Sequence, residues 1–386
     1  MSPLAPFRVA VVQHAPVFLE RAASIEKACR LIAEAGHAGA KLVVFPEAFI
    51  PAYPDWVWVL PPNDRRAQAA LYAELVANAI AAPSDETERL GRAARDAQVQ
   101  VVIGVNEVNA EASGSTLYNS LLFFDAQGNL YAKHRKLVPT YAERLVWAQG
   151  DGSTLAVHAT PLGRLCGVIC WENYMPLTRY AMYAWGAQLY VAATWDRGEP
   201  WLSTLRHIAK EGRVYVIGCC TALRMSDVPD RLGFKRLYPP GREWINAGDS
   251  AVVGPDGAFI AGPLHERQDI LYAEVDPAQY VGSRAMFDAA GHYARPDVFE
   301  LTVRRGTKRM IRDTRPRPKT RRAAARAKTT VAPRRRPPAR AKRARKATAA
   351  PRKRPAARPR TRRVTARRRP RATSTPRRAR TRRKRS

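Results

Sequence analysis

The sequence has few cysteines and no long hydrophobic run, and both absences narrow the class of protein. Its five cysteines are an odd number spread through 386 residues, unlike the dense, paired cysteines of a small secreted domain. No apolar segment approaches the roughly 18 residues that a membrane-spanning helix needs. The first residues, MSPLAPFRVAVVQHAP, lack the basic start and long apolar centre of a secretory signal. These absences predict a cytoplasmic protein with reduced thiols.

Acidic residues are almost missing from the C-terminal part of the chain. Residues 303–386 contain 38 of the 66 Lys and Arg residues but a single acid, Asp313, so this segment has a formal charge of +37. Residues 1–302 have a net charge of −4, which indicates no nucleic-acid partner for that part. We therefore expect one domain at 1–302, followed by a disordered basic tail at 303–386 rich in Arg, Lys, Pro and Ala.

The tail also lacks aromatic residues and hydrophobic periodicity, so it cannot build a core. Three interpretations are open: a polycation that binds nucleic acid or another polyanion, a solvated or spurious extension, and a segment that binds an anionic membrane surface. The Lys-Ala-Thr-Pro composition is similar to that of histone-H1-type tails and favours the first. Without aromatic side chains for base stacking, such binding should be non-specific and strongly dependent on salt.

Residues 1–302 alternate between strand-like and helix-like segments. The segment 8–47 has the order strand, helix, strand, and the alternation continues toward residue 220. Two segments, 120–136 and 250–263, have the form of hairpins, because a turn sequence separates two apolar runs. This order predicts an α/β domain in which helices cover sheets, and the two similar hairpins indicate internal pseudo-symmetry.

Three ionisable residues lie where predicted strands end, which is where α/β proteins usually place their chemistry. Glu47 follows a buried strand, Lys136 ends a basic one, and Cys170 ends the strand RLCGVIC. Each has an ordinary interpretation: a helix cap for the acid, a solvated edge for the lysine, and core packing for the cysteine. Together they suit covalent catalysis without a metal, because an ammonium lowers the pKa of a thiol and a carboxylate accepts its proton.

The other cysteines and the histidines give no competing site. A thiol enzyme with a histidine base is the alternative, but the histidines lie in helix-like or polar segments that suggest no such pairing. Cys166 has the same strand parity as Cys170, so we expect it on the same face as a packing residue. Cys219 and Cys220 end a later apolar strand and are assigned to the core.

Four long segments contain or surround these residues: VFPEAFIPAYP (44–54), HRKLVPTYAERLVWAQGDGSTL (134–155), GVICWENYMPLTRYAMYAWG (167–186) and GHYARPDVFEL (291–301). They resemble the nitrilase branch of the carbon-nitrogen hydrolase superfamily, and the resemblance covers most of residues 6–302. It implies a four-layer α-β-β-α sandwich with pseudo-twofold halves. It also implies assembly into a homo-oligomer, because family members form dimers and spirals.

The resemblance implies a role for each candidate residue. Glu47 would be the general base, Lys136 the cation that stabilises the tetrahedral intermediate, and Cys170 the nucleophile. Glu143 matches a second glutamate of the family that positions the lysine and the substrate, and an acid at a helix start is an equally good interpretation. No metal or other cofactor is implied.

The residues after the nucleophile separate the branches of this superfamily. Here CWENYMP is similar to nitrilases, whereas many amidase-type members have a Cys-Tyr-Asp pattern. The expected reaction is hydrolysis of a nitrile to the carboxylic acid and ammonia, through a thioimidate and a thioester on Cys170. Three alternatives are open: an amidase, release of the amide in place of the acid, and a nucleic-acid-binding protein with an idle hydrolase-like body.

Three aromatic residues near the motifs, Tyr53, Trp171 and Trp195, are candidates for the wall of a substrate pocket. Such a wall would favour a substrate with an apolar group, and core packing is an equally good interpretation. The aromatic residues do not identify the substrate, so arylacetonitriles, aliphatic nitriles, cyanoalanine and cyanide all remain open.

Overall fold

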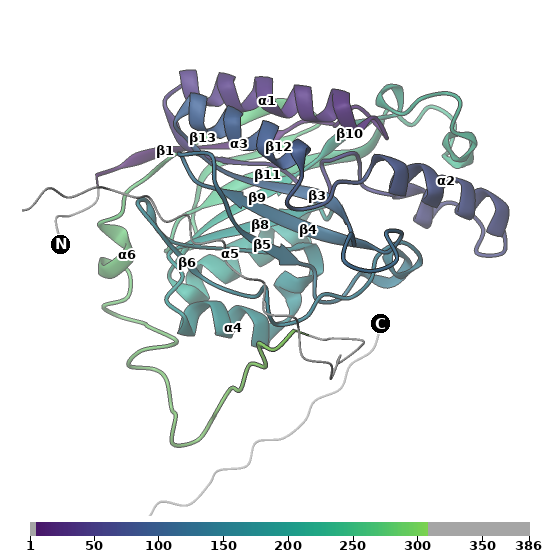
Figure 1. Ribbon diagram of the computed structural model, residues 1–386. Helices are drawn as coiled ribbons and strands as arrows, with labels where there is room; N and C mark the ends of the chain where they lie inside the picture. Colours follow the sequence, from purple (N-terminus) through teal and green to yellow (C-terminus); the bar gives the residue numbers. More distant parts are fainter. Residues whose placement is uncertain (1–4, 308–386) are drawn as a thin grey trace, which may run out of the picture. The chain divides into compact units, whose positions relative to one another are not determined.

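Two β-sheets lie face to face and helices cover their outer faces, as Figure 1 shows. The structure is a computed structural model that describes residues 5–307. The first sheet has the strand order β13-β1-β2-β3-β4-β5. Its strands are β1 (Phe7–Gln13), β2 (Ala40–Val44), β3 (Gln100–Val108), β4 (Leu117–Phe124), β5 (Leu130–Arg135) and β13 (Asp269–Val275).

The second sheet has the order β10-β11-β9-β8-β7-β6, and β12 also pairs with β11. Its strands are β6 (His158–Thr160), β7 (Gly163–Ile169), β8 (Leu189–Thr194), β9 (Tyr215–Cys220), β10 (Ala222–Arg224), β11 (Trp244–Val253) and β12 (Phe259–His265). The helices are α1 (Arg21–His37), α2 (Arg65–Asn78), α3 (Asp85–Ala97), α4 (Pro176–Ala184), α5 (Glu199–Gly212) and α6 (Gln279–Gly282).

Three apolar layers join these elements. Helices α1 and α3 bury residues such as Ile25 and Leu90 against the first sheet, and α4 and α5 bury residues such as Met182 and Ile208 against the second. The middle layer lies between the sheets and contains residues such as Val11 from β1. Removal of this apolar surface from water is the main stabilising contribution. The layers form the four-layer α-β-β-α sandwich that the family resemblance implied.

The two halves repeat one plan, which confirms the expected pseudo-symmetry of the fold. In the first sheet β1, β2 and β3 are parallel, and the antiparallel hairpin β4–β5 continues from β3. In the second sheet β7, β8 and β9 are parallel, and the antiparallel hairpin β11–β12 continues from β9. These are the two hairpins whose similarity the sequence indicated. The site described below lies where β2, β5 and β7 end.

The prediction that Cys166 shares a face with Cys170 is wrong. Cys166 packs in the layer under α4 and α5, whereas Cys170 joins the layer between the sheets. The strand ends at Ile169, and Cys170 has a left-handed φ of 51°, so the two-residue alternation stops before it reaches the cysteine. The assignment of Cys166 to packing agrees with its complete burial.

The tail predicted for 303–386 lies outside the described residues apart from its first few positions, and its boundary stays a prediction. None of the helices formed within residues 5–307 is long and apolar enough to cross a membrane.

Candidate active site

Glu47 lies in the loop after β2, where the chain packs directly against β3. A side chain at Gly104 would place its Cβ 2.2 Å from the carbonyl oxygen of Pro46 and 2.5 Å from the amide nitrogen of Ala48. Only glycine therefore allows this approach, and the Gly104 amide donates a hydrogen bond of 3.1 Å to Pro46. The contact holds Glu47 in a fully buried position.

Lys136 follows β5 and is held by its backbone on both sides. Its amide donates to the Asn119 carbonyl at 2.8 Å, and its carbonyl accepts from the Gly150 amide at 2.8 Å. A Cβ at Gly150 would lie 2.3 Å from the carbonyl oxygen of Arg135, so this contact also requires glycine. The lysine side chain is buried, contrary to the solvated edge that its basic neighbours suggested as the ordinary interpretation.

Cys170 begins the short 3-10 helix Cys170–Tyr174 at the end of β7. A left-handed φ is uncommon for a residue with a side chain and persists only where the surroundings enforce it. Here the side-chain amide of Asn173 donates to the backbone carbonyl of Cys170 at 2.7 Å. The backbone amide of Ile169 donates to the carboxylate of Glu172 at 2.7 Å. These bonds fix the turn that directs the thiol into the layer between the sheets.

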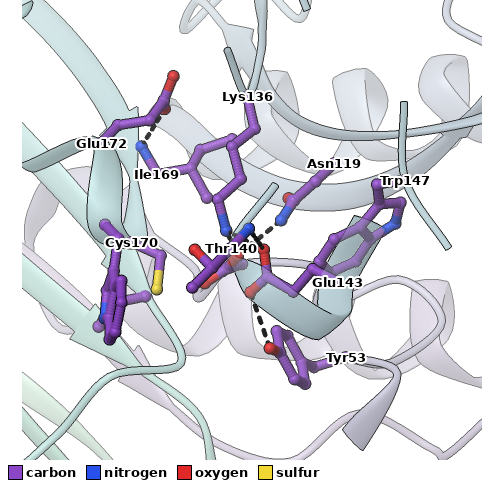
Figure 2. A network of polar contacts seen from close by, with 12 residues as sticks. Tyr53, Asn119, Lys136, Thr140, Glu143, Trp147, Ile169, Cys170 and Glu172 are labelled. Carbon is purple, nitrogen blue, oxygen red and sulfur yellow. Dashed lines mark hydrogen bonds and ion pairs between the residues drawn. The ribbon is translucent and has the colours of Figure 1, made fainter. Parts of the chain in front are cut away.

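The structure brings Glu47, Lys136, Glu143 and Cys170 together. Figure 2 shows Lys136, Glu143 and Cys170 at this site. The Lys136 ammonium donates to Glu47 Oε1 at 2.8 Å and to Glu143 Oε2 at 2.6 Å. One carboxylate oxygen of each glutamate and the sulfur of Cys170 all lie within 4.8 Å of one another. Residues that are far apart in the sequence thus form one buried cluster.

Glu143 caps a short helix and also contacts the lysine. Its Oε2 accepts the Thr140 amide at 2.7 Å at the start of the 3-10 helix Tyr141–Leu145, so it is a capping residue. Its Oε1 accepts the hydroxyl of Tyr53 at 2.8 Å, while Oε2 also binds Lys136. Glu143 therefore connects the lysine to the aromatic residues beside it.

Burial controls the protonation of the cluster. It raises the pKa of Glu47 to about 7, with Glu143 acting in the same direction and Lys136 in the opposite one. Burial alone would lower the pKa of Lys136, but the charges of Glu47, Cys170 and Glu143 outweigh it, so this pKa is raised and the ammonium stays charged.

The pKa of the Cys170 thiol is raised well above its usual value, which corrects the sequence-based expectation that the neighbouring ammonium lowers it. Burial is the largest cause, Glu47 and Glu143 add to it, and the opposing effect of Lys136 is smaller than their sum. A neutral thiol must therefore pass its proton to a base as it attacks.

Glu47 has one oxygen suited to that task. Its Oε1 accepts from Lys136 and, at 2.6 Å, from the side chain of Asn119. Its Oε2 is buried and makes no hydrogen bond with any of the described residues. The spacing of Glu47, Glu143 and Cys170 would also suit a metal ion, but the Lys136 ammonium already bridges both carboxylates.

A cavity of about 430 Å³ opens onto Cys170, and the three aromatic residues predicted for a pocket all line it. The buried rings of Tyr53 and Trp195 stack with their centroids 4.2 Å apart. Trp171 is 51% exposed and donates to Asp196 at 2.8 Å. The sequence did not predict the charged part of the same wall, which consists of Asp55, Asp196, Arg197 and Arg242.

Two further residues of the site were missed by sequence reasoning. Asn119 orients Glu47, and its only signal was an amide within the apolar strand LYNSLLFF. Glu172, two residues after Cys170, is buried and accepts three donors: the Ile169 amide at 2.7 Å, the Leu137 amide at 2.7 Å and His134 at 3.0 Å. Glu172 therefore ties the residue before Cys170 to the residue after Lys136.

Replacing Glu172 with alanine is expected to lower kcat by roughly 10²-fold, with a smaller change in KM, because a misplacement of about 1 Å between reacting groups has an effect of this size. Glutamine retains one acceptor oxygen and should recover part of the loss. Steady-state kinetics with thermal unfolding as a check on folding measure both. Glu107→Ala is the matched control, since Glu107 is equally buried but pairs with Lys133 and Arg135. Equal losses of kcat in the two variants would contradict this role.

The sequence model of the carbon-nitrogen hydrolase family matches residues 8–285, which is most of the chain. The chain therefore belongs to the carbon-nitrogen hydrolase family and is a hydrolase acting on carbon-nitrogen bonds. Similar proteins include an aliphatic nitrilase of Sinorhizobium fredii, 45% identical over 303 residues that cover 77% of this chain and 95% of that relative. A bifunctional nitrilase/nitrile hydratase of Nicotiana tabacum is 41% identical over 304 residues, covering 77% of this chain and 86% of its own.

Solved structures with the same fold are more distant in sequence. Nit3 of Saccharomyces cerevisiae, a member of branch 10 of the nitrilase superfamily, has a TM-score of 0.59 and 22% identity, covering 75% of this chain and 97% of its own. An amidase from Nesterenkonia sp. has a TM-score of 0.54 and 20% identity, covering 72% of this chain and 94% of its own. At this identity the likeness shows the fold alone.

Proposed function

We propose that this chain is a nitrilase, which hydrolyses a nitrile to the carboxylic acid and ammonia. The observation that carries the proposal is the buried cluster in which Cys170 lies within 4.8 Å of a carboxylate oxygen of Glu47 and of Glu143, with Cys170 and Glu143 lining the cavity. The relatives at 38–45% identity that are named nitrilases favour this reaction over the amidase alternative.

The first half of the proposed reaction forms a covalent thioimidate. The Cys170 thiol gives its proton to Glu47 as the sulfur attacks the nitrile carbon, and the proton then passes to the nitrile nitrogen. Lys136 lies where it can stabilise the negative charge that develops on this nitrogen, together with a backbone N–H near Trp171. Glu143 holds the lysine in place from the other side.

The second half consumes two water molecules. Glu47 takes a proton from the first water, which attacks the thioimidate carbon, and the collapse of this intermediate releases ammonia and leaves a thioester. The second water hydrolyses the thioester in the same way, which releases the carboxylic acid and restores the thiol. In this series of steps, Glu47 and Cys170 exchange the protons with substrate and water.

The decisive experiment is a panel of nitriles and the corresponding amides, tested with purified full-length protein, with ammonia, acid and amide measured separately. A nitrilase converts at least one nitrile to ammonia and acid in equal amounts. Hydrolysis of amides with no turnover of any nitrile would establish the amidase alternative, and accumulation of the amide would establish a hydratase outcome. Inertness toward both classes would leave the idle-scaffold alternative.

We further propose that the enzyme works in the cytoplasm as a homo-oligomer and that its tail binds polyanions. The five cysteines lie among the described residues and form no disulfide, which suits a reducing compartment. The charge of +37 on residues 303–386, against −4 on the rest, supports a separate polyanion-binding segment.

A chain that ends after residue 307 is expected to keep the kcat/KM of the full chain within about twofold and to lose binding to DNA. The reason is that every group of the cluster lies before that point, while the cationic density lies after it. Ammonia-release kinetics and gel-shift titrations at low and high salt measure the two properties. DNA binding by the shortened chain, or salt-independent binding by the full chain, would contradict the assignment to the tail. Size-exclusion chromatography of both chains tests the assembly.

A further inference from the structure

The cavity above Cys170 has a charged wall that the proposed mechanism does not use. Arg197 lies between β8 and α5, Arg242 precedes β11, and Asp55 begins the 3-10 helix Asp55–Trp58, so three separate loops place charged groups on one cavity. An apolar nitrile would give these groups nothing to bind. Charges inside a pocket normally fix the orientation of a polar ligand.

Arg242 is the best-placed cation on this wall. It is half-buried, and its Nε and one terminal nitrogen donate to the carbonyls of Trp244 at 2.9 Å and Ile245 at 3.1 Å. Its guanidinium also lies 5.3 Å from the ring centre of Tyr238. These contacts hold the group in one orientation, while its second terminal nitrogen makes no hydrogen bond within the described part of the chain. A guanidinium held in this way is suited to bind a carboxylate.

Neither arginine of the wall pairs with a carboxylate in the described part of the chain. Among residues 5–307 no carboxylate forms a salt bridge with Arg197 or with Arg242. Asp196 instead accepts hydrogen bonds from the side chains of Trp171 at 2.8 Å and Tyr174 at 2.9 Å. Asp55 is buried, and burial raises its pKa to about 7 against the effect of the two arginines, so it is a weak counter-ion near neutral pH.

Two hydroxyl groups on the same cavity add to this pattern. Tyr238 and Thr140 are each only 8% exposed, and neither side-chain oxygen has a hydrogen-bond partner among the residues that the structure describes. A buried polar group without a partner costs free energy, so such groups are usually satisfied by a ligand or by water. Tyr238 lies under Arg242, which places a hydroxyl and a guanidinium at the same part of the wall.

We propose that the substrate is a nitrile with a carboxylate at its other end, which Arg242 and Arg197 bind while the nitrile carbon lies at Cys170. This inference rests on the nitrilase function proposed above and names its substrate class. It differs from the apolar substrate that the aromatic residues of the motifs suggested, because Tyr53, Trp171 and Trp195 form only part of the wall. The aromatic part then contacts the carbon chain between the two polar ends.

The experiment compares a homologous series of ω-cyanocarboxylates with neutral nitriles of the same shape, in which an isopropyl group replaces the carboxylate. The expected result with full-length enzyme is a kcat/KM at least about tenfold higher for the best cyanocarboxylate, the factor that one charge-assisted hydrogen bond supplies. The number of carbon atoms between the two ends of the best substrate indicates the distance from Cys170 to the two arginines.

Variants of Arg242 test the assignment to this residue. Arg242→Met should lower the ratio of kcat/KM between the anionic and the neutral substrate about tenfold, and Arg242→Lys should restore part of it. Arg224→Met is the matched control, because Arg224 lies 4.6 Å from the ring centre of Trp244 but does not line the cavity. This control should leave the ratio unchanged. An equal fall in the control would overturn the role of Arg242.

Failure of this inference is distinguishable from failure of the proposed function. Turnover of neutral nitriles with no preference for the anionic series would overturn the substrate class and leave the nitrilase proposal intact. If no nitrile is turned over, the same paired compounds are compared as protectants of Cys170 against alkylation by iodoacetamide. Stronger protection by the carboxylate in the wild-type chain, lost in Arg242→Met, supports the carboxylate site, and equal protection overturns it.

Discussion

Alanine in place of Cys170 is expected to abolish ammonia release from every nitrile that the wild-type chain hydrolyses. Each step of the proposed reaction passes through a bond to this sulfur, and no neighbouring side chain can replace it. Removal of a catalytic nucleophile typically lowers kcat by roughly 10⁵-fold or more, which places the residual rate below detection. Ammonia assays with thermal unfolding as a check on folding measure the effect, and mass spectrometry should detect a covalent adduct only with the wild-type chain.

Cys166→Ala provides the matched control for this variant. Cys166 is also buried and lies four residues earlier in the chain, within β7, but it packs under α4 and α5 away from the cluster. Its replacement should lower thermal stability slightly and leave kcat close to the wild-type value. Retained hydrolysis by the Cys170 variant, or equal loss in both variants, would refute the nucleophile assignment.

Glutamine in place of Glu47 is expected to lower kcat by about 10²–10⁴-fold, the usual contribution of a general base, with little change in KM. The amide oxygen of glutamine can still accept from Asn119 and Lys136, so the geometry of the cluster should persist. What is lost is the oxygen that accepts the proton of the thiol or of water. Steady-state kinetics across the pH range measure both the loss and its cause.

The pH profile gives an independent test of the same residue. Burial raises the pKa of Glu47 to about 7, and the base must be deprotonated to act. The wild-type rate should therefore rise with pH through about 7 and level off above it, whereas Glu47→Gln should lack this rising limb. Glu107→Gln, in a buried carboxylate outside the cavity, should retain the limb. A limb that survives in Glu47→Gln would assign the titration to another group.

The architecture could be predicted from the sequence because it depends on periodicity. Alternating apolar residues, turn sequences and strand-helix order predicted an α/β domain in which helices cover sheets, and the two hairpins indicated internal pseudo-symmetry. The division into four layers was implied by the resemblance of the motifs to a known family. The grouping of Glu47, Lys136 and Cys170 also followed from their place at strand ends. The face on which Cys166 lies could not be predicted in this way. The left-handed conformation of Cys170 ends the alternation of side chains along the strand, and the prediction depended on that alternation.

The details that determine reactivity depend on contacts between distant segments, which a sequence pattern does not show. Asn119 reaches Glu47 across 72 positions of sequence, and Arg242 lines one cavity with Asp55 and Arg197, which come from other loops. The direction of the pKa shift at Cys170 depends on how completely the thiol is buried. Local propensity contains none of this information, so these features emerge only from the fold.

The two glycines beside the cluster have a consequence for the interpretation of genetic variants. Gly104 and Gly150 contribute no functional group, yet any side chain there would push the Glu47 loop or the Lys136 backbone out of place. A ranking of positions by the chemical reactivity of their side chains would classify substitutions at both glycines as harmless. Substitutions at either glycine are instead expected to impair the site as strongly as substitutions of Glu47 or Lys136, because the neighbouring main chain leaves no room for a side chain.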